Sequence, residues 1–450
     1  MSDETQGELR RELGVRSSVL LTAGAMIGTG IFVSPIETAR LTTSATAMLV
    51  VWALGAALSL LGALAFAEAG AAMPETGGLA VYVRRAFGDW AAFVFGWTML
   101  VVLVPSSFAF FAQVAFWNLR DAAITSNPFV ADAIVVSLVA ANVLGLRAGA
   151  GLQNTLTVVK VLGIAAVGLA AAWFAVRGGA STIVASTPST VAPSMLAAMV
   201  PVLWAYDGWI DITSVAGEVR SPRKTLPRAI VGGTLLVAAL YLFVLTSVLA
   251  GSSHRALASL GDGSTIFSAG ALSSRSVRPW LASLVAIASV GAAAVGYMSG
   301  VRVVFAVAKE GLLFAPLASV SRRGVPAVAL IVCGAIAIAY IHSPLRKLGE
   351  VFVLGAWPFY ALGALGVARL RARGAFDRGG DGAEEAASEG RFRTPLFPVP
   401  QVVFALVSVA IVAGYAVRDP RNTLISLGTI ATGLVIYPVF RLAKSRSKRR

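Results

Sequence analysis

Residues that bind metal ions or cross-link chains are almost absent from this sequence. Its single cysteine, Cys333, lies within an apolar run and can form no disulfide within the chain. The two histidines, His254 and His342, fall in predicted loops outside the long apolar runs. A membrane-embedded enzyme would need a convergent set of catalytic side chains or a metal cluster. We therefore predict that the protein is not an enzyme and that it holds neither a metal ion nor a cofactor.

Charge is also scarce. Charged residues make up 13% of the chain, whereas a typical soluble domain is about 25% charged. The net charge of +15 comes from short clusters between apolar runs and not from one basic face, so we expect no nucleic-acid partner. The hydrophobic share of 57% and the mean hydropathy of +0.79 instead predict that a lipid bilayer surrounds most of the chain.

Long apolar runs are what the sequence has in abundance. A helix needs about 20 apolar residues to cross a bilayer, and about twelve runs qualify as predicted spans. They lie near residues 17–39, 45–70, 90–117, 130–149, 153–176, 193–216, 228–250, 279–307, 325–342, 350–370, 399–417 and 423–440. If the N-terminus is cytoplasmic, the inner segments carry more than twice as many Lys and Arg residues as the outer ones. This asymmetry predicts a multi-pass protein of the inner (plasma) membrane with both termini in the cytoplasm.

Two of these spans contain residues that interrupt a lipid-facing helix. Residues 24–32 (GAMIGTGIF) hold three glycines, each a poor helix former. Residues 204–211 (WAYDGWID) place Asp207 and Asp211 near the middle of the membrane, where an unpaired carboxylate is costly. Unwound backbone is tolerated at that depth only where it lines a cavity or is buried in protein. There its N–H groups attract a carboxylate and its carbonyls attract an ammonium, so the pair of breaks predicts a site for a zwitterion.

The position of the breaks also predicts an architecture. They fall in the first and sixth spans, and a repeat of five helices comes out inverted in the membrane, as in one large class of secondary transporters. Each break also has a simpler interpretation, since Gly24 and Gly28 form a helix-packing motif and Asp207 could be a satisfied core carboxylate. We divide the chain into a cytoplasmic tail (1–16), two five-helix repeats (17–176 and 193–370), a flexible cytoplasmic loop (371–398), two further helices (399–441) and a basic cytoplasmic tail (442–450).

Four segments resemble one transporter family. Residues 24–32 are similar to the first-helix signature of the amino acid–polyamine–organocation (APC) superfamily, and residues 201–230 resemble its sixth helix and following loop. Residues 67–88 and 300–314 fit its second-loop and eighth-helix patterns. The resemblance is nearest to the L-type amino acid transporter branch and its bacterial serine/threonine-exchanger-like relatives. It implies an all-α integral membrane fold: a five-plus-five inverted repeat with discontinuous helices 1 and 6, plus two C-terminal helices.

The resemblance also implies a substrate site at the breaks. By position, the amides of Gly28, Thr29 and Gly30 would hold the substrate carboxylate. Carbonyls at Ile27, Trp204 and Asp207 would hold its ammonium. The predicted site takes in the rest of the second break as well, namely Ala205, Tyr206 and Gly208. Trp204 would be the aromatic gate over the substrate, with plain packing as the alternative.

Further residues are candidates for coupling or gating. Lys160 resembles a lysine that the L-type branch uses where sodium-coupled relatives bind sodium, and a side chain extending to the interface is the alternative. Glu68 and Arg302 are candidates for inner-gate ion pairs, although we favour extension to the interface for both. Asp211 could favour a cationic substrate, take up a proton or cap the restarted helix.

The sequence thus predicts a secondary transporter of amino acids that works by alternating access, through sodium-independent exchange of neutral L-amino acids. The alternatives are a proton-coupled or exchanging carrier of basic amino acids or polyamines, and a non-transporting amino-acid sensor on the same fold. Animal L-type transporters use an extracellular cysteine to bond a helper glycoprotein. Residues 118–130 contain no cysteine, so we expect no disulfide-linked helper subunit.

Overall fold

The computed structural model describes residues 13–75, 77–145, 150–179, 194–261, 264–268, 277–376 and 392–447. Within these ranges the protein is helical, and its one β-type contact is an isolated bridge between Leu13 and Val219. The first-half elements are α1 (Val15–Met26), α2 (Gly30–Leu41), α3 (Ala45–Ala72), α4 (Leu79–Phe87), α5 (Asp89–Thr98), η1 (Met99–Leu103), α6 (Val104–Asp121), α7 (Val130–Val143), α8 (Ala150–Phe174) and η2 (Ala175–Gly179). The second-half elements are α9 (Met195–Tyr206), η3 (Asp211–Glu218), α10 (Pro222–Gly251), α11 (His254–Ala258), η4 (Ile266–Ser268), α12 (Arg278–Lys309), η6 (Ala315–Ala318), α13 (Ala327–Ile341), α14 (Leu345–Ala372), α16 (Val399–Arg418) and α17 (Pro420–Ser447).

Among the described residues, nine helical segments are long and apolar enough to cross a membrane, and the bent pair α1 and α2 makes a tenth. Two shorter apolar helices, α7 and α13, have 14 and 15 residues, fewer than the roughly 20 that span a bilayer. All of these segments coincide with the predicted apolar runs, which confirms an all-helical membrane fold.

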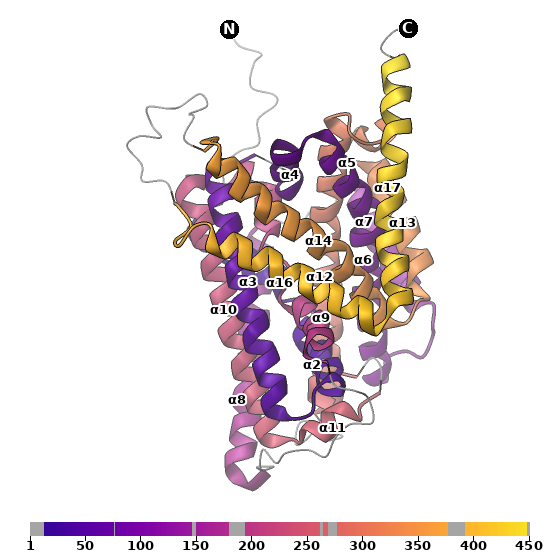
Figure 1. Cartoon of the computed structure of the whole chain (residues 1–450). Coiled ribbons are helices and arrows are strands. Elements are labelled where there is room, and N and C mark those ends of the chain that lie inside the picture. The colour runs from indigo at the N-terminus through magenta and orange to yellow at the C-terminus, as the bar shows by residue number, and fades with distance from the viewer. Residues whose placement is uncertain are drawn as a thin grey trace.

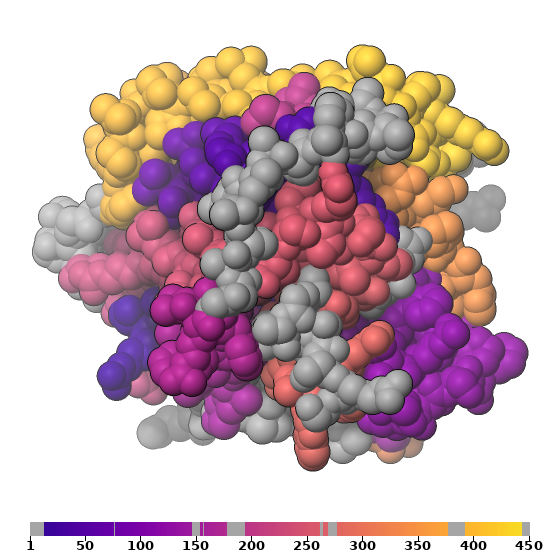
Figure 2. Space-filling model, turned by 90° about the horizontal axis from the view of Figure 1, so that it is seen from below, coloured from indigo at the N-terminus to yellow at the C-terminus, as the bar shows by residue number. Residues whose placement is uncertain are grey.

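The helices form one bundle with two distinct ends (Figure 1). Helices α3, α8 and α10 run together along one side, while α14 and α16 cross the bundle obliquely. The short helix α4 lies at one end, near the last turns of α17, and α11 lies at the other. We call these the α4 end and the α11 end. Seen from the α11 end, α16 and α17 form one edge of the molecule (Figure 2).

The core around the broken helices is rich in aromatic side chains. Trp209 is fully buried and packs against Phe66, Tyr360 and Phe404, so that α3, α14 and α16 all contact the second break. Large rigid rings fill this space at little cost in conformational entropy and bury much apolar surface. Well-packed aromatic side chains therefore surround the broken helices.

Candidate functional site

The first break lies where the sequence predicts it. Helix α1 ends at Met26, α2 begins at Gly30, and the two helices meet at a bend of 41°. The Gly28 N–H bonds the Met26 carbonyl at 2.9 Å, in a turn that no α-helix contains. The N–H groups of Thr29, Gly30 and Ile31 have no hydrogen-bond partner among the described residues, as is usual at a helix start, whereas those of Phe32 and Val33 bond the Thr29 carbonyl. They form a locus of partial positive charge in the middle of the bundle.

The second break is equally well defined. Helix α9 ends at Tyr206, and the 3-10 helix η3 begins only at Asp211. Between them Gly208 has a φ of +106°, which a residue with a side chain rarely adopts. The Asp211 N–H bonds the Gly208 carbonyl at 3.1 Å and restarts the helical path. The glycine in this motif is therefore required by the local backbone.

The two breaks fit into one another through their glycines. A Cβ atom added to Gly30 would lie 2.3 Å from Ala205 Cα, and one added to Gly208 would lie 2.8 Å from the Ala25 carbonyl carbon. In both cases the obstacle is the backbone of the other broken helix. The glycines thus permit a backbone-to-backbone approach that brings the two half-helices together.

Gly24 and Gly28 have different roles, although the sequence presents them as one packing motif. A Cβ on Gly24 would lie 2.2 Å from the Thr157 hydroxyl of α8, so Gly24 allows α1 and α8 to pack closely. The nearest neighbour of Gly28 is the Phe111 ring, at 3.0 Å from such a Cβ. The packing interpretation therefore describes Gly24, although both glycines line the same cavity, where Gly28 faces the Phe111 ring.

That cavity, of about 140 Å³, lies between the two breaks and extends toward the α4 end. It has room for about ten water molecules. The predicted site residues that line it are Gly28, Thr29, Gly30, Trp204, Asp207, Gly208 and Asp211. Its far wall comes from α6 and α12, through residues such as Phe111 and Ser299. The paired breaks thus enclose a space of molecular size.

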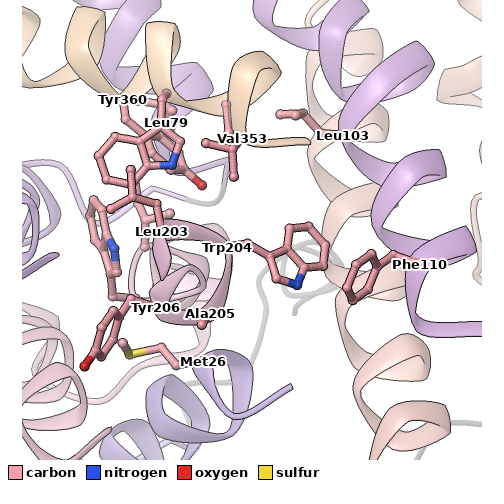
Figure 3. Packing of buried hydrophobic residues seen from close by; sticks show 14 of the residues in the cluster. Met26, Leu79, Leu103, Phe110, Leu203, Trp204, Ala205, Tyr206, Val353 and Tyr360 are labelled. Carbon is pink, nitrogen blue, oxygen red and sulfur yellow. The ribbon is translucent and has the colours of Figure 1, made fainter. Parts of the chain in front are cut away.

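Three of the residues predicted to bind substrate do not line this cavity, namely Ile27, Ala205 and Tyr206. Tyr206 packs against Trp52 and Tyr241, and its side chain points away from Trp204 (Figure 3). Successive residues of a helix point about 100° apart, so at the end of α9 only some of them can face the cavity. The sequence motif located the break but could not show which of its side chains face inward.

Both carboxylates of the second break are at the cavity. Asp207 Oδ1 accepts a hydrogen bond from the Tyr360 hydroxyl at 2.8 Å. Asp211 is the first residue of η3, while Ile210 holds the N-cap position and no side chain caps this helix, so the capping alternative for Asp211 is wrong. No Lys, Arg or His stands among the described residues that line the cavity. Its polar wall can attract a cation.

Trp204 separates this cavity from a second one. Its ring packs against Phe110 and Phe352, with centroids 4.5 and 4.7 Å apart, and against Phe111 at 5.8 Å. Figure 3 shows the ring extending from α9 toward Phe110. Trp204 also lines the second cavity, of about 50 Å³, on the side of the α11 end. The position suits a gate, because movement of this one side chain would join the two spaces.

Lys160 reaches the first break. Its Nζ atom donates to the Ile27 carbonyl at 3.2 Å, and the Tyr241 hydroxyl donates to the neighbouring Met26 carbonyl at 3.0 Å. The alternative that Lys160 extends to the membrane interface is therefore wrong. Carbonyls freed at the end of α1 are satisfied by two side chains from other helices, as buried backbone requires. Because Lys160 bonds the Ile27 carbonyl, the contact with a substrate ammonium predicted there has a competitor.

Glu68 and Arg302 lie outside the cavity and have separate partners. Glu68 is 2% exposed and accepts hydrogen bonds from Arg371 at 2.8 Å and from the Thr394 N–H at 3.0 Å. Arg302 bonds Glu218 at 3.3 Å, which joins α12 to the end of η3. The burial of Glu68 contradicts its predicted extension to the interface. Arg302 is paired with Glu218, and its extension to the interface stays a prediction. Sequence reasoning missed both partners because they are distant along the chain. Arg371 is 303 positions from Glu68, and Glu218 is 84 positions from Arg302.

A smaller ion-pair group holds the α4 end. Arg84 of α4 donates to Asp89 at 2.8 Å and to Glu310, beyond the end of α12, at 2.7 Å. The two carboxylates raise the pKa of Arg84 above its ordinary value. Because all three side chains are exposed, these pairs contribute little to stability. Their effect is to tie α4 to α5 and α12.

No cluster of three or more His, Cys, Asp or Glu side chains suited to a metal ion occurs within the described parts of the chain. The site consists instead of helix ends, two carboxylates and an aromatic partition. Such a site can bind and release a small polar molecule.

Comparison with known proteins agrees with this architecture. The family model described as "Amino acid permease" matches residues 13–436. The b(0,+)-type amino acid transporter 1 of Mus musculus is 31% identical, over 96% of this chain and 88% of that protein. The serine/threonine exchanger SteT of Bacillus subtilis is 28% identical, over 97% of this chain and 98% of that protein.

Among solved structures, a manganese transporter of Eremococcus coleocola, in a mutant form, has a TM-score of 0.59 at 13% identity, covering 98% of each chain. This likeness concerns the fold alone. The family match spans nearly the whole sequence and confirms both the resemblance stated above and the interpretation as a transporter and not an enzyme. The chain belongs to the amino acid permease family of membrane transporters.

Proposed function

We propose that the protein exchanges amino acids across the membrane by alternating access, without sodium. The observation that carries the proposal is the cavity between the two interlocked breaks, lined by Gly28, Thr29 and Gly30 on one side and by Asp207 and Gly208 on the other. The relatives named as an amino acid transporter and as a serine/threonine exchanger support amino acids as the substrate and exchange as the mode of transport.

The chemistry of the cavity suits the head group of an amino acid. The N–H groups of Thr29 and Gly30, at the start of α2, would donate to the substrate carboxylate, which the helix dipole also favours. The Trp204 carbonyl and the Asp207 carboxylate would accept from its ammonium. A zwitterion therefore finds complementary charge on each side, and a molecule with only one of the two groups would leave a partner unsatisfied.

Sodium independence is supported by Lys160. Its ammonium lies 3.2 Å from the Ile27 carbonyl, at the break where freed carbonyls would otherwise attract a cation. Two positive charges about 4 Å apart repel each other strongly in a medium of low dielectric constant. A tethered ammonium can thus support the unwound backbone without an ion that must be bound and released in every cycle.

We propose small neutral L-amino acids as substrates. The cavity of about 140 Å³ has an aromatic wall in which the Phe111 and Trp204 ring centroids lie 5.8 Å apart. The serine/threonine exchanger among the relatives matches this size class.

A second candidate is exchange or proton-coupled transport of basic amino acids. Asp207 and Asp211 both line the cavity, and no basic side chain among the described residues lines it with them. A substrate with a second positive charge would balance these carboxylates. The specific observation in its favour is that the Asp211 carboxylate has no hydrogen-bond or ion-pair partner among the described residues, whereas Asp207 bonds Tyr360.

For the setting, we propose the plasma membrane, with the α4 end in the cytoplasm. The Lys and Arg asymmetry supports this orientation. We also propose that the protein works without a disulfide-linked helper, because Cys333 is buried within α13.

A substrate panel tests the proposal. Purified protein in proteoliposomes, preloaded with unlabelled serine, would be offered labelled Ser, Ala, Thr, Arg, Lys and putrescine. Uptake of the three neutral amino acids supports the first candidate, and uptake confined to the cationic compounds supports the second. Binding of an amino acid by the purified protein without any flux would identify a sensor and contradict both.

A further inference from the structure

The second cavity, on the other side of Trp204, has no role in the function proposed so far. It lies between α2, α9, α14 and α16, toward the α11 end, with a volume of about 50 Å³. Trp204 is the only described residue that lines both cavities. The tryptophan therefore stands between the two spaces.

Charged side chains of both signs line this cavity. The carboxylates are Glu37 and Glu350, and the guanidinium groups are Arg346 and Arg418. The central cavity, by contrast, has carboxylates as its only charged groups among the described lining residues. A space that offers both an anion and a cation suits a zwitterion, whereas purely structural ion pairs need no cavity beside them.

Glu350 is the most informative of these residues. It is 7% exposed, and its Oε1 atom lies 3.1 Å from Arg346 Nη1. Its Oε2 atom is buried and has no hydrogen-bond partner among the described residues. A buried carboxylate oxygen without a donor costs free energy, and such an atom calls for a donor from a bound molecule or for another functional reason.

Tyr415 belongs to the same polar group. Its hydroxyl, also buried, makes no hydrogen bond of ordinary geometry among the described residues. It lines the same cavity and lies within weak hydrogen-bonding reach of Glu350. A primary ammonium has three donors and can serve Glu350 Oε2 and the Tyr415 oxygen together. Arg346, which uses one nitrogen for Glu350, retains N–H groups for a carboxylate.

We propose that this cavity is a second amino-acid site, a loading site that holds the head group of a substrate before Trp204 moves. The ammonium binds Glu350 and Tyr415, and the carboxylate binds Arg346. The space admits about four water molecules, so it accepts the head group while a longer side chain extends toward the α11 end. The proposal rests on the amino-acid transport proposed above and adds a site that acts from one side of the membrane only.

Because the proposed site acts from one side of the membrane only, uptake measured from each side tests it. Right-side-out and inside-out membrane vesicles would be prepared from expressing cells, and the KM and maximal rate for labelled serine uptake measured in each. Vesicles without the protein provide the background. Glu350→Gln keeps the shape of the side chain but removes its charge. Loss of one charge-assisted contact to the ammonium should raise the KM about tenfold, in one vesicle type only, with the maximal rate within twofold.

Two further variants keep the result interpretable. Tyr415→Phe removes only a hydroxyl and should raise the KM about threefold in the same vesicle type. Asp121→Asn, at the end of α6, removes a carboxylate that pairs with Arg278 away from the cavity, and should change neither KM.

The outcomes separate clearly. A KM rise confined to one vesicle type supports the loading site, and the type identifies which membrane face the α11 end occupies. An equal rise in both types, or no change in either, overturns the proposal even though transport itself continues. If Glu350→Gln fails to fold, Tyr415→Phe decides alone by the same criterion. Absence of uptake by the unmodified protein in both vesicle types contradicts the proposed function and not this site alone.

Discussion

The close approach of the two broken helices predicts a large effect of a single methyl group. Gly30→Ala would place a Cβ atom 2.3 Å from Ala205 Cα, whereas non-bonded carbon atoms are comfortable at about 3.5–4.0 Å. The obstacle is backbone, so no side-chain rotation relieves it. Helices α2 and α9 must therefore separate by more than 1 Å at the point where both line the cavity.

The cost follows from that displacement. Overpacking of a well-packed interior costs about 1–3 kcal/mol, and we expect the upper part of this range because the contact is with backbone. A displacement of about 1 Å at a binding constellation can reduce the rate about 100-fold. We thus expect Gly30→Ala to lower the thermal midpoint by roughly 5 °C and serine exchange by about two orders of magnitude.

The measurement combines thermal unfolding of the purified protein in detergent with exchange in proteoliposomes. Gly291→Ala is a matched control, because Gly291 lies within α12 and no atom lies within 4 Å of its added Cβ. This control should unfold at the same temperature or slightly higher, since alanine favours a helix over glycine by about 1 kcal/mol. If Gly30→Ala matched the unmodified protein in both assays, the reciprocal packing of the two breaks would be refuted.

Three further predictions concern Lys160, Trp204 and Glu68. Lys160→Met removes the donor to the Ile27 carbonyl, and a lost charged hydrogen bond of about 1.5–3 kcal/mol should lower exchange at least tenfold, measured as initial uptake rate with and without sodium. Trp204→Ala joins the two cavities and should let preloaded amino acid escape without counter-substrate, whereas Trp204→Phe should remain tight in the same efflux assay. Glu68→Gln leaves Arg371 without its carboxylate and should lower the free energy of unfolding by about 2 kcal/mol, measured by chemical denaturation in detergent.

Each of these has a result that would count against it. Full exchange by Lys160→Met would show that the ammonium is dispensable at the break. An equally tight Trp204→Ala would exclude the partition role of this ring. For Glu68→Gln the comparison is Asp89→Asn, which breaks an exposed pair with Arg84 and should cost less than about 1 kcal/mol. If the two variants lost equal free energy of unfolding, the burial of Glu68 would add nothing to the stability that its ion pair provides.

Local features of the site could be predicted from sequence because they are visible over a few residues. The glycines at 24–30 and the Asp-Gly pair at 207–208 are poor choices for a lipid-exposed helix, so the breaks followed from helix propensity and from the cost of a charge in lipid. The length and apolarity of the spans likewise predicted the helical membrane fold.

The partners of these residues could not be predicted, since they are set by packing between distant segments. Tyr360 is 153 positions from Asp207, and Arg371 is 303 positions from Glu68. The interpretation that Glu68 reaches the interface failed for this reason: its depth in a helix was readable, but its partner was not. The same holds for the direction of Tyr206, which depends on Trp52 and Tyr241 filling the space behind α9.

The most direct test of the central claim is the requirement for internal amino acid in the absence of sodium. Proteoliposomes containing the purified protein would be loaded with serine or left empty, and uptake of labelled serine would be followed in sodium-free and sodium-containing buffer at neutral pH. The structure predicts rapid uptake into loaded vesicles, little uptake into empty ones, and no effect of sodium. Uptake that depended on sodium, or that was equal in empty and loaded vesicles, would contradict sodium-independent exchange.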